Sequence, residues 1–179
     1  GSDSVLRTES SERSPWNQAD VFLRHSAMPV FAYQFTVDTP VKVVSQFHFQ
    51  PNILQKLCPP LTWMQVHRFE PLADGSVAEF TMWLGPIPVR WQAVHSAVSA
   101  AGFTDTQVAG PMKRWVHTHS FTAISDHQSR VSEHIEFEHH RGPRGLWSRL
   151  LFPRPALLLL FWFRCRATRR GCALLAGSE

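Results

Sequence analysis

The chain has 179 residues, a length typical of one domain with a short tail. Hydrophobic residues make up 44% of it and charged residues 18%, which excludes a disordered, collagen-like or coiled-coil chain. The net charge of +4 resides in one segment, because residues 141–179 carry eight Arg and one Glu whereas residues 30–140 carry nine acids and seven bases. A nucleic-acid-binding domain spreads its basic residues over the body, so no nucleic acid is expected as a partner.

The three cysteines, Cys58, Cys165 and Cys172, form no CxxC pair and no metal-ligand spacing. An odd number of cysteines without a secretory signal predicts reduced thiols and a cytoplasmic protein. The longest apolar run, residues 156–163, is too short to cross a bilayer, which takes about 20 residues. Residues 1–29 are predicted to be a polar, partly disordered lead, and residues 30–175 a single domain.

The first elements of this domain are a strand and two short helices. Val30–Val37 alternates between two faces, which predicts a half-buried strand. Asp38-Thr39-Pro40 is typical of a helix start, because a capping side chain precedes a proline at the first helical position. We therefore expect a helix from Pro40 to about Phe49. A second short helix, Ile53–Cys58, is ended by Pro59-Pro60.

Turn residues divide the next part of the chain into further strands, and a long helix follows. The helix is expected over Leu146–Leu175, interrupted at Pro153 and Pro155. This order predicts an α+β fold in which a curved antiparallel sheet of six to seven strands wraps around the C-terminal helix. A pocket is expected between the sheet and that helix. The predicted strands are Thr62–Phe69, Ser76–Leu84, Val89–Val98, Phe103–Val108, Lys113–Ile124 and Arg130–His139.

Four stretches carry a family signature: DTPVKVVSQFHFQPNILQKLCPPL at 38–61, GPIPVRW at 85–91, GPMKRWVHTHSF at 110–121 and FWFRCRATRR at 161–170. They resemble the START/Bet v 1-like (SRPBCC) superfamily, and in particular its bacterial ligand-binding and polyketide cyclase/dehydrase-like branch. The resemblance implies the helix-grip fold, but it selects no activity, because the superfamily includes binders, carriers and enzymes. The chain departs from the branch pattern at two positions. Glu133 replaces an expected Asp, and Phe137 replaces a Tyr, which removes one hydroxyl from the pocket.

Two histidines stand out on one predicted strand. Alternation places His117 and His119 on the same face as Trp115 and Phe121. They are either hydrogen-bonded core residues, a polar spot inside an aromatic pocket, or two ligands of a metal with Glu133 as the third. We predict no metal and no cofactor.

Glu133 is an acid on an otherwise apolar face, because it alternates with Ile135 and Phe137. A buried carboxylate needs a partner. The candidates are His119 on the neighbouring strand and Arg164 on the C-terminal helix.

Arg164 lies in the middle of the apolar stripe of its helix, with Leu157 and Phe161. It is either a buried ion-pair partner, a ligand anchor, or an arginine that reaches the rim of the fold from a helix end. We expect Arg164 and Glu133 to face the same cavity and to pair directly, through His119, or through a ligand.

The first half of the same helix is apolar all round. Leu158, Leu159, Trp162 and Phe163 fall outside the core-facing stripe. We expect a second chain or residues 1–29 to cover them in part, and a homodimer or a membrane surface to be possible partners.

The function expected first is binding of a hydrophobic or aromatic small molecule, or a lipid, in the cavity. A cyclase or dehydratase with His117 or His119 as acid or base is the second hypothesis, and Glu133 completes this tentative catalytic set. A lipid carrier or membrane-surface protein using the basic helix is the third. The residues expected to bind the ligand are Trp91, Phe103, Trp115, Phe121, Ile135, Phe137, Phe161 and Arg164.

Overall fold

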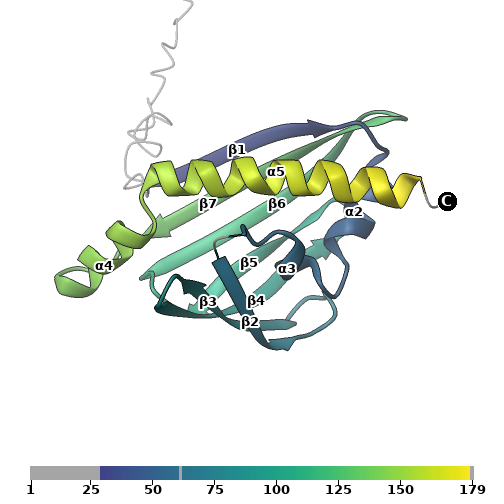
Figure 1. The fold of residues 1–179 in the computed structure, drawn as a ribbon. Coiled ribbons are helices and arrows are strands. Elements are labelled where there is room, and N and C mark those ends of the chain that lie inside the picture. Colours follow the sequence, from purple (N-terminus) through teal and green to yellow (C-terminus); the bar gives the residue numbers. More distant parts are fainter. Residues whose placement is uncertain (1–28, 61, 178–179) are drawn as a thin grey trace, which may run out of the picture.

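A computed structural model describes residues 29–60 and 62–177 of the chain. Among these residues, seven strands form one antiparallel sheet and the long helix α5 lies across it (Figure 1). The α+β helix-grip architecture expected from the sequence is therefore confirmed. In chain order the elements are β1 (Val30–Val37), α2 (Val41–His48), α3 (Ile53–Lys56), β2 (Thr62–Phe69), β3 (Val77–Leu84), β4 (Ile87–Ser99), β5 (Gly102–Ala109), β6 (Arg114–Ser125), β7 (Gln128–Glu138), α4 (Pro143–Leu151) and α5 (Arg154–Ala176).

The strand order is β1-β7-β6-β5-β4-β3-β2. β1 therefore forms one edge of the sheet, beside β7, and β2 forms the other edge. The segment with α2 and α3 carries the chain from one edge of the sheet to the other. Alternation on β6 and β7 buries Trp115, His117, His119 and Phe121 on one strand and Glu133 on the next. The predicted inward face of this hairpin is confirmed.

The C-terminal region forms two helices because of its prolines. Pro143 opens α4 after Gly142, whose φ of +68° suits glycine. Pro153 has extended backbone and caps α5, while Pro155 stands in the first turn of α5, where a missing N–H breaks no helical bond. The two helices meet at an angle of 41°. The predicted helix over 146–175 is thus divided at its prolines, and it begins three residues earlier than expected.

Two apolar clusters hold α5 against the sheet. One contains Phe31, Trp91 and Phe161, and the other contains Phe47 of α2 and Cys172 of α5. Gly171 lets α2 approach α5, because a Cβ at this position would lie 2.1 Å from the ring of Phe47. Between these clusters the sheet carries polar side chains.

No single helix in the described ranges is long and apolar enough to cross a membrane, although the bent pair α4 and α5 passes by length and composition. The cytoplasmic location stays a prediction. The predicted cover for the apolar side of α5 is also untested, because residues 1–28 lie outside the described residues. Leu158, Leu159 and Trp162 are exposed, and Phe163 is half-buried.

Candidate functional site

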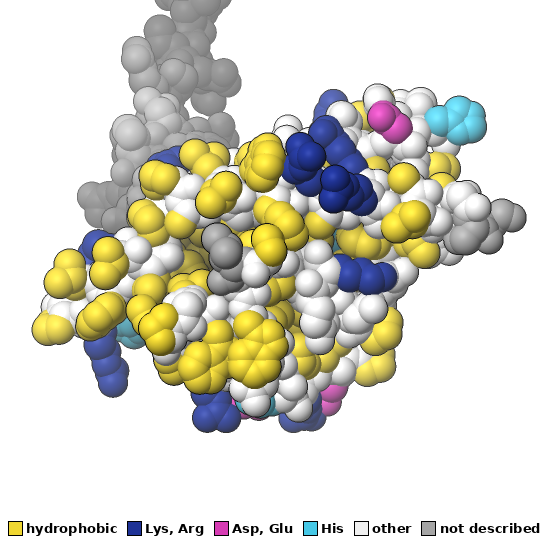
Figure 2. Space-filling view, in the orientation of Figure 1, with side chains coloured by type: hydrophobic (Ala, Val, Ile, Leu, Met, Phe, Trp, Pro, Cys, Tyr) yellow, Lys and Arg dark blue, Asp and Glu magenta, His cyan; other side chains and the backbone are white. Residues whose placement is uncertain are grey.

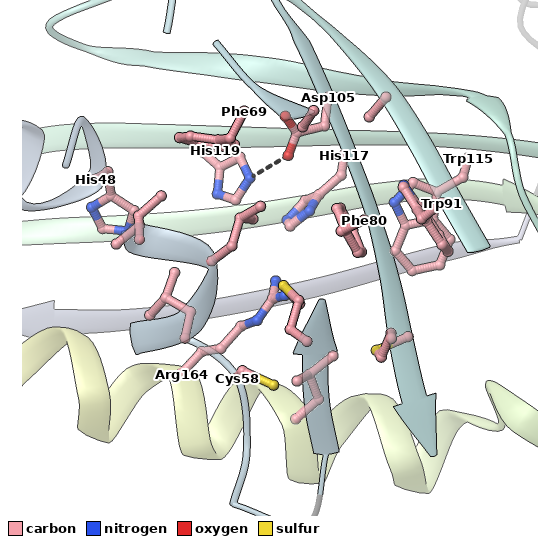
Figure 3. Close-up of a pocket in the computed structure, with 18 of the residues that line it drawn as sticks. His48, Cys58, Phe69, Phe80, Trp91, Asp105, Trp115, His117, His119 and Arg164 are labelled. Carbon is pink, nitrogen blue, oxygen red and sulfur yellow. Dashed lines mark hydrogen bonds and ion pairs between the residues drawn. The ribbon is translucent and has the colours of Figure 1, made fainter. Parts of the chain in front are cut away.

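A cavity of about 130 Å³ lies between α5, α3 and the concave face of the sheet (Figure 3). Its volume is smaller than the few hundred Å³ typical of drug-sized ligand pockets. Its walls are mostly apolar and aromatic. The residues that line it include His48, Met64, Met82, Trp91, Asp105, Trp115, His117, His119, Phe161 and Arg164.

Most of the ligand-binding residues expected from the sequence line this cavity. Trp91, Phe103, Trp115, Phe161 and Arg164 do so, together with both predicted histidines. Four expected site residues are outside the lining. Ile135 and Phe137 fill the core around Phe161, Phe121 packs in the cluster around Phe47, and Glu133 lies behind the two histidines.

A row of polar side chains crosses four neighbouring strands beside the cavity. On β4 and β5, His95 Nδ1 lies 2.9 Å from Ser76 Oγ, and its Nε2 lies 3.0 Å from Asp105 Oδ1. On β6, His119 Nε2 lies 3.1 Å from Asp105 Oδ2. Asp105 is therefore held between two histidines.

The row continues to β7. Glu133 Oε2 lies 2.8 Å from His117 Nε2 and 2.8 Å from His119 Nδ1. The contact with His117 is a hydrogen bond, whereas the contact with His119 Nδ1 is an ion pair without a hydrogen bond. The predicted partnership of Glu133 with His119 is confirmed, and it includes His117.

The two histidines of β6 differ in protonation because their partners differ. Burial lowers the pKa of His119, but Glu133 and Asp105 raise it by more, so that it lies at about 9. Burial and the neighbouring His119 cation lower the pKa of His117 to about 4, against the opposing effect of Glu133. Near neutral pH, His119 is therefore a cation and His117 is a neutral imidazole.

The two acids stay charged for a complementary reason. Burial acts to raise the pKa of Glu133, but the His119 cation and the hydrogen bond from His117 hold it well below its usual range. The pKa of Asp105 is lowered as well, because hydrogen bonds from His119 and His95 outweigh its burial. Two carboxylates thus face two cations, His119 and Arg164.

Arg164 extends from α5 into the cavity, toward the side on which His117 lies (Figure 3). Its guanidinium lies over the ring of Phe161, with Cζ 5.3 Å from the ring centroid. Its buried Nε makes no hydrogen bond with any residue that the structure describes. The direct Arg164–Glu133 pair, one of the three predicted arrangements, is not formed, since the ion pairs of Glu133 go to the two histidines.

Three site residues were missed in the sequence. Asp105 and His95 belong to the polar row, and His48 of α2 lines the cavity with its Nδ1 2.8 Å from the carbonyl oxygen of Val44. Burial lowers the pKa of His48 to about 4, although the Val44 carbonyl partly opposes this. Strand alternation could have placed Asp105 on the same face as Phe103, because the two residues are two apart.

Asp105, His117 and His119 each offer one ligand atom, and these atoms lie within 4.8 Å of one another. A divalent cation could be held there, with Asp105 rather than the predicted Glu133 as the third ligand. The fixed charge of Arg164 in the same cavity opposes a further cation. His119 and Arg164 already balance the two carboxylates without a metal.

A second hollow, of about 590 Å³, lies between α4 and the sheet, and its lining includes Leu151, Pro88, Val89 and the largely exposed Trp147. It is larger and more open than the first cavity. None of the histidines of the polar row reaches it, so the first cavity remains the candidate site.

No family model and no curated protein sequence matches the chain. Solved structures do match it. The protein TTHA0849 from Thermus thermophilus is similar over 84% of this chain and 100% of its own, with a TM-score of 0.62 and 15% identity. The Zhui aromatase/cyclase from Streptomyces sp. R1128 is similar over 81% and 91%, with a TM-score of 0.59 and 14% identity.

Norcoclaurine synthase from Thalictrum flavum, solved in complex with dopamine and hydroxybenzaldehyde, is similar over 99% of this chain and 98% of its own. Its TM-score is 0.58 and its identity 14%. These structural similarities establish the fold, but identities this low do not establish the activity. The chain therefore shares the helix-grip α+β fold of these solved structures.

Proposed function

We propose that the chain binds a compact aromatic or otherwise hydrophobic molecule that carries an anionic group. The observation that carries the proposal is the buried Nε of Arg164, which has no acceptor among the described residues and lies in an aromatic-walled cavity. A buried donor without an acceptor is unfavourable. An anion on the ligand supplies that acceptor.

The size of the cavity supports a ligand with about one ring. A dry apolar cavity of about 150 Å³ is large enough to hold benzene. The volume of about 130 Å³ is close to this, and the flexible side chains of Met64 and Met82 can give way for a substituent. The fold also supports the proposal, because norcoclaurine synthase was solved with two compact aromatic molecules.

Benzoate and benzyl alcohol test the roles of ring and charge. We expect wild-type protein to bind both, and Arg164→Leu to weaken benzoate binding about tenfold or more while changing benzyl alcohol binding little, since a hydrogen bond to a charged group contributes roughly 1.5–3 kcal/mol. Arg166→Leu is the matched control, because Arg166 is exposed and its guanidinium stacks on Trp162. Ligand-observed NMR titrations give the affinities. Failure of the wild-type chain to bind either molecule, or equal losses in both arginine variants, contradicts the proposal.

A second candidate function is acid–base catalysis on the same bound molecule, as in a cyclase or dehydratase. The observation that favours it is the neutral His117 beside the cationic His119, both lining the cavity. Such a pair offers a base and an acid at one pH. His117→Asn would then abolish turnover and leave benzoate binding in place, whereas a pure binder shows no turnover in either protein.

A further inference from the structure

Helices α4 and α5 expose large apolar side chains with the same spacing. Each helix presents them at positions i, i+1 and i+4, which fall within an arc of about 100° on one side of a helix. The six side chains are between 51% and 70% exposed, and a soluble monomer rarely exposes so many together. We call them the apolar face: Leu146, Trp147, Leu150, Leu158, Leu159 and Trp162.

Basic residues continue this face toward the C-terminus. Arg166 and Arg170 follow Trp162 at four-residue intervals, so they lie on the same side of α5. The guanidinium of Arg166 lies over the Trp162 ring, 5.1 Å from its centroid. Figure 2 shows hydrophobic side chains over α4 and the adjoining part of α5, and a group of Lys and Arg farther along α5. The surface is therefore apolar at one end and cationic at the other.

The charge decides between two occupants of this surface. The chain contains eight Arg and no Asp or Glu between residues 139 and 178. A second copy packed through the same face brings no carboxylate of α4 or α5 to these arginines, so the face is not complementary to itself in charge. An anionic lipid surface offers phosphates to the arginines and an apolar boundary to the leucines and tryptophans.

We propose that the apolar face of α4 and α5 docks the protein on an anionic bilayer. The two helices lie in the plane of the surface, with Trp147 and Trp162 at the level of the lipid headgroups, where tryptophan is favoured. Arg166 and Arg170 bind lipid phosphates beside them. The proposal does not depend on what the cavity holds.

Vesicle co-sedimentation of the full chain tests this proposal. We expect binding to vesicles of phosphatidylcholine with 30% phosphatidylglycerol, little binding to phosphatidylcholine alone, and weaker binding at high salt. Combined replacement of Leu158, Leu159 and Trp162 by Gln should abolish sedimentation. Combined Arg166→Gln and Arg170→Gln should weaken it about tenfold or more, since each basic residue near an anionic surface contributes roughly fivefold.

The matched control is a variant with Val108→Thr and Ile124→Thr, two exposed apolar residues on the strands β5 and β6. It should bind vesicles as the wild type does, and circular dichroism should show all variants folded. Sedimentation velocity provides the competing outcome. A dimer that the triple Gln variant disrupts, together with no vesicle binding, would overturn the proposal and assign the face to a second copy. Equal binding by wild type and triple Gln variant would overturn it as well.

Discussion

Replacement of Glu133 by leucine is expected to lower the free energy of unfolding by about 3–5 kcal/mol, because it leaves a buried cation without its partner. Glu133 is 5% exposed and is paired with His117 and His119. Without it, His119 keeps Asp105 as its only acid partner among the described residues. Chemical denaturation monitored by circular dichroism measures the loss.

A double-mutant cycle identifies the partner. His119→Phe removes the cation and keeps an aromatic ring stacked on Phe103, so Glu133→Leu should cost less in this background than in the wild type. Arg164→Leu should give no comparable rescue, because no ion pair joins Arg164 to Glu133. Glu138→Gln is the surface control, and it should cost about 0–1 kcal/mol although Glu138 Oε1 lies 2.6 Å from Lys113 Nζ. A loss for Glu133→Leu no larger than this control would show that the row does not stabilise the fold.

The stability of the protein is expected to be greatest near pH 6.5 and to fall on both sides. The pKa of His119 is raised in the fold to about 9, so its contribution is complete below 6.5 and is lost as the pH rises to 9. The pKa values of His48 and His117 are lowered to about 4, so their contributions are present above 6.5 and are lost as the pH falls to 4. Each of these three pKa shifts corresponds to about 3 kcal/mol in the free energy of unfolding. Denaturation midpoints between pH 4 and 9 measure this profile.

Single variants show which histidine causes the loss of stability on the acid side and on the alkaline side of pH 6.5. His119→Phe should flatten the alkaline limb, and His48→Phe should reduce the acid limb. His127→Asn is the control for both, because His127 is exposed. Below about pH 4.5, protonation of Glu133 and Asp105 adds to the acid loss, because both pKa values are lowered in the fold. A stability that stays constant between pH 6.5 and 9 would contradict a buried His119 cation.

The sequence predicted the strands and their faces well because periodicity determines both. The bounds of β1 and β2 agree with those predicted, and the inward faces of β6 and β7 were assigned residue by residue. The same rule applied to β4 and β5 would have placed His95 with Trp91 and Asp105 with Phe103. Aromatic residues mark both faces, and the aromatic pattern alone does not reveal these two polar residues.

Periodicity does not predict the distances between helices and strands, because these distances depend on how side chains pack across the fold. Arg164 and Glu133 were correctly placed on inward faces, yet their direct pairing depends on the gap between α5 and β7, which periodicity does not specify. The cavity volume depends in the same way on how closely α3 and α5 approach the sheet. For this reason the place of the cavity was predicted but its volume was not, and Ile135 and Phe137 were expected in its wall although they fill the core.

The indole N–H signals of the protein report most directly whether a compact aromatic anion enters the cavity. Trp91 and Trp115 line it, whereas Trp63 and Trp162 are exposed and lie outside its lining. Titration of ¹⁵N-labelled protein with benzoate, with the signals assigned by single Trp→Phe variants, should shift the Trp91 and Trp115 signals and leave those of Trp63 and Trp162 in place. Shifts confined to Trp63 or Trp162, or no shifts at saturating benzoate, would contradict a ligand site between the sheet and α5.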